Sequence, residues 1–295
     1  MDEIPVSVEA IRQSEGHRSG FVTLVGRPNV GKSTLLNAFL GQKVTIVSDK
    51  PQTTRTEVRG VLNRDNAQAI FCDTPGIHKP KTLLGRRLND TARMALDGID
   101  VVLFLVEADG GIGTGDQFVA KSLPVDKTIL VLNKIDKVKK NQILTQLDKA
   151  SIFSFDEYFP VSAATGEGVA ELLDHIINRF AIGPRYYSEE TVTDVPEAFW
   201  VSELVREQLL EEVREELPHS IATRVTDWNW PHIRCEILVE RESQKGIVIG
   251  HKGAMLKYVG TKVREQLPEG AFIELVVKVE KDWQRQSRSL DRFGY

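Results

Sequence analysis

One eight-residue stretch constrains this chain more than any other. Residues 26–33 have the sequence GRPNVGKS, which fits the pattern G-x-x-x-x-G-K-[ST]. A short apolar, β-branched run over residues 21–25 precedes it, and residues 34–40 have the character of a helix. A strand before and a helix after are the context that this pattern requires. The sequence therefore predicts a phosphate-binding loop.

The residues of this loop have separate predicted tasks. Its two glycines allow backbone N–H groups and the helix N-terminus to surround phosphate oxygens. Lys32 places a charge at the β- and γ-phosphates, and the Ser33 hydroxyl is a ligand for Mg²⁺. We expect nucleotide contacts along the whole loop and from the residue after it, namely Gly26, Arg27, Pro28, Asn29, Val30, Gly31, Lys32, Ser33 and Thr34.

Length and composition limit the remaining possibilities. A chain of 295 residues predicts two domains. With 41% hydrophobic residues, 27% charged residues and a net charge of −4, any surface for nucleic acid must be local. Cys72 and Cys235 lie in strand-like runs, which favours buried thiols over a disulfide. No apolar run is long enough for a signal peptide or a membrane span, so we expect a cytoplasmic protein.

Strand-like and helical segments alternate through residue 180. The expected strands cover residues 58–63, 68–72, 101–106, 128–132 and 158–161, and the expected helices lie around 117–122 and 142–155 and at 169–180. This alternation predicts an α/β fold with a mainly parallel sheet and helices on both faces. Ligands bind outside the carboxyl ends of the strands in such a sheet, so polar residues at those ends are candidate site residues.

The expected strand over residues 68–72 is followed directly by the sequence Asp73-Thr74-Pro75-Gly76. Asp73 is expected to be a second anchor for Mg²⁺, and the backbone N–H of Gly76 can be offered to the γ-phosphate. Ile77 follows, and its side chain cannot orient an attacking water as a glutamine would. Hydrolysis must therefore receive help from another residue.

Two later strand ends predict which base is bound. Asp136 can accept hydrogen bonds from N1–H and the exocyclic amine of guanine, whereas adenine offers neither donor in that geometry. Asn133 either contacts the other edge of the base or holds neighbouring loops together, and the stem of Lys134 can lie along the ring. After the next strand come Ser162, Ala163 and Ala164, where the N–H of Ala163 is expected to meet the guanine carbonyl.

The last hundred residues have a different pattern. A helix from residue 197 to 217 is followed by strands 221–226 and 233–240, a short helix, the sequence G-x-x-G at 250–253, a helix over 254–267 and a strand over 272–279. A G-x-x-G loop between helices allows close approach of a nucleic-acid backbone, with an apolar groove beside it for unpaired bases. We expect RNA contacts from Ile249, Gly250, His251, Lys252, Gly253 and Lys257.

These motifs together resemble a known family. Residues 20–182 resemble the translation-factor-related GTPases, and GRPNVGKSTLLN with QTTR at 52–55 resembles the Era family in particular. The order α-β-β-α-α-β with G-x-x-G resembles a KH domain of the prokaryotic arrangement. The resemblance implies a GTPase that binds single-stranded RNA at the 3′ end of 16S ribosomal RNA and serves in assembly of the 30S subunit.

The resemblance also implies roles for single residues. Thr54, rather than Thr53, is expected to close over Mg²⁺ when GTP is bound. Asn29 is expected to ligate a potassium ion that acts where an arginine finger otherwise would, the alternative being that Asn29 stabilises the loop turn. The expected catalytic residues are thus Lys32, Asn29, Thr54 and Gly76, and the expected Mg²⁺ site is formed by Ser33, Thr54 and Asp73.

The expected domain boundaries follow from these segments. We expect an N-terminal tail over 1–19, a GTPase domain over 20–182, a linker over 183–196, a KH domain over 197–282 and a C-terminal tail over 283–295. In the last tail, aromatic residues such as Trp283 and Phe293 alternate with arginines, which suits either stacking on bases or docking of the tail on its own domain.

Other functions remain open at this stage. The chain could be a membrane- or protein-docked GTP switch whose second domain binds a protein partner, and loss of RNA affinity at every sequence would favour that alternative. An RNA remodeller that steps along its substrate is a third possibility, but there is no second motor domain. We further expect a monomer whose contact with the inner membrane face, if it has one, is peripheral.

Overall fold

The computed structural model describes residues 16–295, so most of the predicted N-terminal tail lies outside the described residues. The chain forms two compact units that alternate along the sequence. Within the described residues, the first unit comprises residues 16–45, Glu57–His78 and Asn89–Asp194, and the second comprises Ile46–Thr56, Lys79–Leu88 and Val195–Tyr295. Two segments of the predicted GTPase region therefore belong to the second unit.

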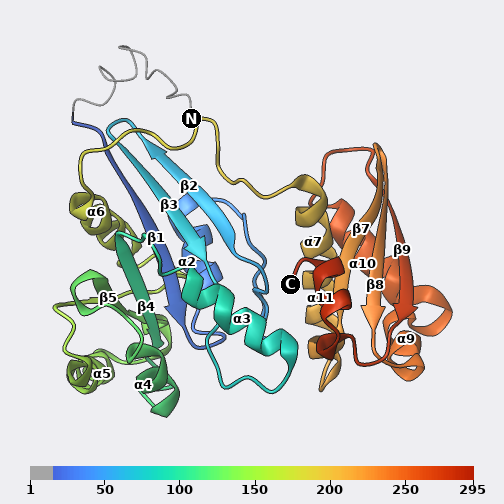
Figure 1. Cartoon of the computed structure of the whole chain (residues 1–295), viewed down its shortest axis with the longest axis horizontal. Coiled ribbons are helices and arrows are strands. Elements are labelled where there is room, and N and C mark those ends of the chain that lie inside the picture. Colours follow the sequence, from blue (N-terminus) through green and yellow to red (C-terminus); the bar gives the residue numbers. More distant parts are fainter. Residues whose placement is uncertain (1–15) are drawn as a thin grey trace. The chain divides into compact units, whose positions relative to one another are not determined.

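The first unit is built on a six-stranded sheet with the order β2-β3-β1-β4-β5-β6 (Figure 1). Every neighbouring pair is parallel except β2 and β3, which form an antiparallel hairpin. The strands are β1 (Arg18–Gly26), β2 (Val58–Arg64), β3 (Ala67–Asp73), β4 (Val101–Glu107), β5 (Thr128–Asn133) and β6 (Glu157–Pro160). Its helices are α2 (Lys32–Leu40), α4 (Thr114–Ala120), α5 (Lys140–Ala150) and α6 (Val169–Arg179). Helix α3 (Leu83–Met94) begins in a segment of the second unit and ends in the first unit.

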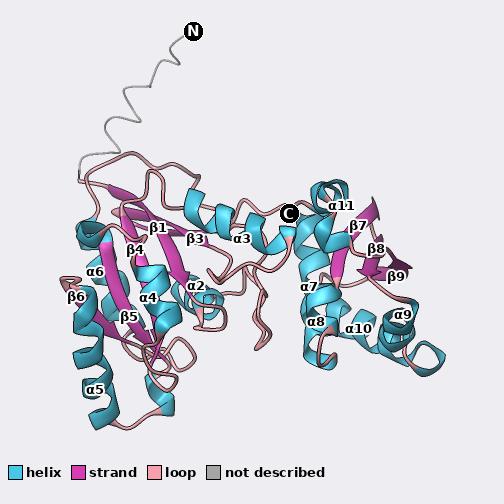
Figure 2. Ribbon diagram, turned by 60° about the horizontal axis from the view of Figure 1, so that its bottom comes forward, coloured by secondary structure: helices cyan, strands magenta, loops and turns pink. Residues whose placement is uncertain are grey.

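Helices cover both faces of this sheet (Figure 2). Alternate residues of β4 show why, because Leu103 and Leu105 belong to the core under α2 and α6, while Phe104 and Val106 belong to the opposite core under α4 and α5. A strand buried on both faces must be apolar throughout, which explains the unbroken run VVLFLV in β4. The predicted α/β fold class is confirmed.

Helix α3 was not predicted. Its sequence LLGRRLNDTARM is mostly polar, but its buried residues Leu84, Leu88 and Ala92 recur every four positions and so share one face. This spacing of apolar residues is the feature of the sequence from which the helix could have been predicted. Among the described helices, none combines the length and apolar character that crossing a membrane requires.

Most of the segment expected to be a linker packs against the first unit. Gly60 pairs with Thr193 in an isolated antiparallel bridge, and the side-chain amide of Asn63 donates to the carbonyl oxygens of Glu189 and Thr191 at 3.0 and 3.1 Å. The buried side chain of Gln68 also binds the backbone of Tyr187. Residues 183–194 therefore pack against β2 and β3, although their composition resembles that of a loop.

The second unit has the predicted order α-β-β-α-α-β, with one short extra helix before the first strand and another after the last strand. A three-stranded sheet has the order β7-β8-β9, in which β7 and β8 are antiparallel and β8 and β9 are parallel. Its elements are α7 (Glu197–Glu212), α8 (Leu217–Ser220), β7 (Ala222–Asn229), β8 (His232–Val239), α9 (Glu242–Ile249), α10 (Ala254–Arg264), β9 (Phe272–Val279) and α11 (Ser287–Phe293).

Two cores hold this unit together. Alternate residues of β8, such as Ile237 and Val239, pack with α7, α9 and α10. Leu238, which points to the other face, packs with Trp283 and with residues of α11. Trp283 has no exposed surface, and its indole N–H donates to the Ser220 carbonyl at 2.9 Å. Of the two roles considered for the C-terminal aromatic residues, docking within their own unit is therefore the one that Trp283 adopts.

Candidate nucleotide and nucleic-acid sites

The phosphate-binding loop lies between β1 and α2, at the carboxyl end of a central strand. Its backbone has positive φ angles at Asn29 (67°) and Gly31 (97°). A Cβ atom on Gly31 would lie 2.3 Å from the side-chain nitrogen of Asn133, so only glycine fits there. The loop conformation thus depends on a residue that is 102 positions further along the chain.

Lys32 is buried in this loop. Its ammonium donates to the carbonyl oxygens of Arg27 at 3.1 Å and of Gly26 at 3.4 Å. Burial lowers the pKa of Lys32 to about 8, and the nearby Asp73 carboxylate partly opposes that shift. The charge is therefore poorly stabilised by the chain itself, and a bound phosphate would supply the missing counter-charge.

Ser33 and Asp73 meet at the same place. The Ser33 hydroxyl donates to Asp73 Oδ2 at 2.7 Å, and the Thr45 hydroxyl donates to the same oxygen at 3.2 Å. Asp73 has no exposed surface. Two of the three residues predicted to hold Mg²⁺ are thus brought together, with Thr45 as a neighbour that sequence reasoning did not single out.

The Asp73-Thr74-Pro75-Gly76 segment lies against the phosphate loop. A Cβ on Gly76 would come within 2.7 Å of the Pro28 nitrogen, so glycine permits the close contact. The buried Thr74 hydroxyl donates to the Leu24 carbonyl at 2.7 Å, which makes its side chain structural. Ile77 is buried, and its N–H donates to the Gly26 carbonyl at 3.2 Å.

Asn133 joins the loops of the predicted base site. Its amide nitrogen donates to the Val30 carbonyl at 2.8 Å, and its amide oxygen accepts from the Ala163 N–H at 3.0 Å. Of the two roles considered for Asn133, the structure shows the one that holds loops together. The Ala163 N–H, expected to meet the guanine carbonyl, is instead used by Asn133. In the described part of the chain, no backbone partner is seen for the next N–H, that of Ala164.

Lys134 and Asp136 occupy the turn after β5. Lys134 has a φ of 66°, and its ammonium donates to the Asn29 carbonyl at 2.7 Å and pairs with Glu107. Asp136 is exposed, and its Oδ1 accepts from the Ser162 hydroxyl at 2.5 Å. Ser162 therefore orients the carboxylate. Glu107 was missed by the sequence analysis, although its position at the end of β4 was an available signal.

Thr54 lies in the second unit, so its predicted approach to Mg²⁺ remains a prediction. The buried Arg55 beside it donates to the Ile221 carbonyl at 2.6 Å and to the His219 carbonyl at 3.2 Å. Its guanidinium also lies 5.7 Å from the ring centre of Trp283 and 5.5 Å from that of Tyr295. Arg206 of α7 binds the Thr53 carbonyl. The segment over residues 46–56 is thus held firmly by residues of the second unit.

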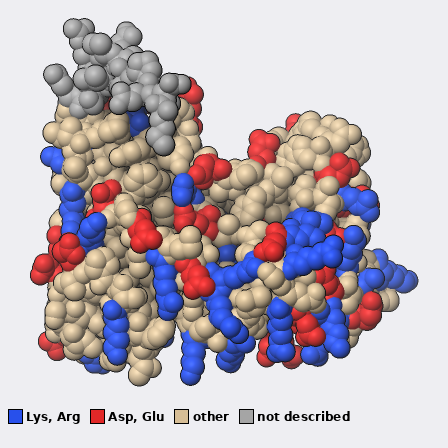
Figure 3. Space-filling view, in the orientation of Figure 1, with Lys and Arg blue, Asp and Glu red and all other residues tan. Residues whose placement is uncertain are grey.

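The G-x-x-G loop connects α9 to α10. Gly250 and Gly253 have φ angles of 73° and 80°, and Lys252 between them has 50°. A Cβ on Gly250 would lie 2.8 Å from Met255, whereas one on Gly253 would meet no atom within 4 Å. His251, Lys252 and Lys257 are exposed, and Ile249 is half-buried. Figure 3 shows Lys and Arg side chains over the part of this unit that carries α9 and α11, with acidic side chains among them.

Comparisons with known proteins identify a GTPase domain and a KH domain. A family model described as a 50S ribosome-binding GTPase matches residues 21–134, and one described as a KH domain matches residues 216–284. The crystal structure of Era in complex with MgGDPNP and nucleotides 1506–1542 of 16S ribosomal RNA is similar over 95% of this chain and 99% of that chain, with 38% identity and a TM-score of 0.91. This chain belongs to the Era family.

A second structure of the family is nearly as similar. It is that of a variant of Era from Aquifex aeolicus bound to GDP and AlF4−, with 38% identity and a TM-score of 0.90 over 94% of this chain and 99% of that chain. Membership in the Era family confirms the prediction of a GTPase with a C-terminal KH domain.

Proposed function

We propose that this Era-family protein binds single-stranded RNA at the 3′ end of 16S ribosomal RNA and acts in assembly of the 30S subunit under the control of GTP. The observation that carries the proposal is the presence of a guanine-nucleotide site and an exposed G-x-x-G loop in one chain. The similarity to an Era structure that contains a GTP analogue and a 16S ribosomal RNA fragment supports it.

Mg²⁺ is the proposed metal of the nucleotide site. The chemistry of the donors fits, because Ser33 and Asp73 supply a hydroxyl and a carboxylate oxygen 2.7 Å apart, and Mg²⁺ is commonly held by one or two carboxylates together with substrate phosphates. Thr54 is the proposed third ligand. When bound, Mg²⁺ neutralises charge on the β- and γ-phosphates.

The protein residues then divide the work of hydrolysis. Lys32 binds the γ-phosphate through its ammonium, and Gly76 offers its N–H to the same group. Ile77 is buried and apolar, so it cannot position the attacking water. Asn29 is the proposed ligand of a potassium ion, for which an amide oxygen is a suitable donor.

Control by GTP is supported by the position of Thr54. The segment that must close over the nucleotide also contains Arg55, which binds carbonyl groups of residues 219 and 221 in the second unit. A ligand that favours one arrangement of this segment therefore shifts the state of the unit that carries the G-x-x-G loop. We further propose that the protein is a cytoplasmic monomer whose membrane contact, where it occurs, is peripheral.

The proposal is tested by measuring RNA affinity with a GTP analogue and with GDP. We expect tighter binding with the analogue, and by linkage RNA must tighten the analogue over GDP by the same factor. Equal RNA affinities with the GTP analogue and with GDP, together with no effect of RNA on the affinity of either nucleotide, would contradict control by GTP.

The RNA site is tested with Gly253→Asp, which should reduce RNA affinity at least about tenfold while leaving GTP hydrolysis without RNA unchanged. Gly270→Asp is a matched control, because Gly270 also has a positive φ, of 92°, and open space at its Cβ, but lies outside the G-x-x-G loop. Equal RNA affinities for the two variants would refute the assignment of the RNA site.

A further inference from the structure

A pocket lined by tryptophans lies in the second unit and shares no lining residue with either site described above. It has a volume of about 350 Å³, which is within the range of small-ligand pockets. Its walls come from α7, the β7–β8 hairpin and the segment after α10, and they comprise Glu197, Trp200, Val201, Trp228, Trp230, Ile233, Gln266, Leu267 and Pro268.

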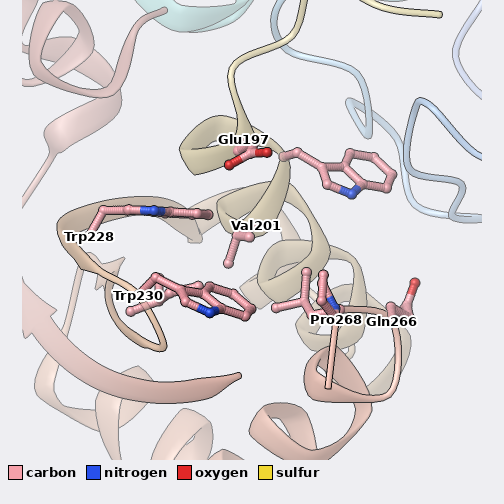
Figure 4. A pocket seen from close by; sticks show the side chains of 9 residues that line it. Glu197, Val201, Trp228, Trp230, Gln266 and Pro268 are labelled. Carbon is pink, nitrogen blue, oxygen red and sulfur yellow. The ribbon is translucent and has the colours of Figure 1, made fainter. Parts of the chain in front are cut away.

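Two of the indoles form the sides of the pocket. Figure 4 shows Trp228 edge-on above Trp230, whose ring is tilted toward the viewer, with Val201 beside them and the Glu197 carboxylate above Trp228, on the side away from Trp230. The exposed fractions of Trp228 and Trp230 are 37% and 47%, which is high for tryptophan, the largest apolar side chain. An exposed indole face accepts a flat group that can stack on it.

The charge of the residues that line the pocket indicates which flat ligands can bind there. Glu197 is the only charged residue among those lining the pocket, and no lysine or arginine lines it. Lys262 binds Glu265 and Arg234 binds Glu274, while the guanidinium of Arg264, the last residue of α10, binds the Gly260 carbonyl and the Thr261 hydroxyl. A ligand that enters therefore meets aromatic faces and one carboxylate, a combination that attracts a cation and repels an anion.

We propose that this pocket binds the side chain of an arginine presented by a protein partner. A guanidinium is flat and always charged, stacks on the faces of tryptophans, and can form two parallel hydrogen bonds with a carboxylate such as that of Glu197. The inference is independent of the proposed RNA function, because it uses no residue of the G-x-x-G loop.

A base of single-stranded RNA is the other flat group to consider, and the observations disfavour it. A base brings phosphates with it, and the cations expected to hold them, Lys252 and Lys257, lie at the start of α10. The pocket residues Gln266–Pro268 follow the end of that helix, whose 11 residues span about 16 Å. At the pocket itself, Glu197 would oppose a phosphate.

The indole N–H signals of the four tryptophans provide a direct test in solution NMR. We would titrate the full chain with a capped Gly-Arg-Gly peptide, with the same peptide containing citrulline, and with a single-stranded hexanucleotide. Citrulline keeps the flat shape and loses the charge. The arginine peptide should shift the Trp228 and Trp230 signals with a dissociation constant on the order of 1 mM. The signal of Trp283, which is buried and bonded to Ser220, should not move.

Two charge variants separate the pocket from general electrostatics. Glu197→Gln should weaken the arginine peptide about tenfold and remove its preference over citrulline. Glu269→Gln removes the same charge from an exposed residue that does not line the pocket, and should bind as the wild type does. An unchanged Trp283 signal in each variant would show that the fold is intact.

Each contrary outcome overturns the proposal. Equal binding of the arginine and citrulline peptides would leave Glu197 without a role. Tighter binding of the hexanucleotide at the same two signals would make the pocket an RNA site. Absence of a saturable shift up to about 20 mM peptide would leave no arginine site.

Discussion

Replacing Asp136 by asparagine should change which nucleotide the protein prefers. In the structure Asp136 Oδ1 accepts from the Ser162 hydroxyl at 2.5 Å, so the second carboxylate oxygen is left to face a base. Guanine would donate to this carboxylate from N1–H and from its amine. In Asp136→Asn, Ser162 can still donate to the amide oxygen, which turns the amide NH₂ toward the base. That group opposes the guanine amine but can donate to the carbonyl that xanthine has at the same position.

The expected magnitude follows from the bonds that are lost. Each hydrogen bond to a charged group contributes about 1.5–3 kcal/mol. Asp136 is exposed in the nucleotide-free chain and must give up water to bind, so the lower end of that range applies. Two such bonds give about 3 kcal/mol, or a loss of about 100-fold in GTP affinity. Xanthosine triphosphate should gain affinity in the variant by a comparable factor.

The assay is a fluorescence titration of both nucleotides with wild type and variant. Adding Ser162→Ala to the variant should reduce the new preference, because the amide then loses the donor that orients it. Thr165→Ala is the matched control, since it removes a hydroxyl from the same loop that does not contact Asp136. A change in GTP affinity of less than about threefold in Asp136→Asn would refute this account of base recognition.

Two further predictions concern the phosphate site. Because burial lowers the pKa of Lys32 to about 8 and phosphates favour its charged form, GTP binding above pH 8 should take up a proton, and affinity should fall as pH rises. Calorimetry in buffers of different ionisation enthalpy measures this, and uptake that persists in Lys32→Ala would contradict it. Hydrolysis should run about tenfold faster in potassium than in sodium at equal ionic strength, with the difference lost in Asn29→Ala. Equal rates in both salts would leave Asn29 with a structural role.

Features that depend on a local pattern could be predicted from the amino-acid sequence. The phosphate loop, its flanking strand and helix, and the buried strand β4 could be predicted because glycine spacing and apolar runs act over a few residues. The element order of the KH domain followed for the same reason. The class of nucleotide followed from Asp136, because its position after a parallel strand places it at the ligand edge.

Tertiary structure decided the contacts between distant parts of the chain. Asn133 could not be assigned to loop packing over base binding until Val30 and Ala163 were seen on either side of it. Residues 46–56 have no periodicity of their own, so only the carbonyl groups around Arg55 reveal that they join the second unit. Trp200, Trp228 and Trp230 are separated along the chain and form one pocket only when α7, β7 and the end of α10 pack together. In each case the contact depends on packing and hydrogen bonding between residues that are far apart along the chain. Such contacts cannot be predicted from the neighbouring residues in the sequence.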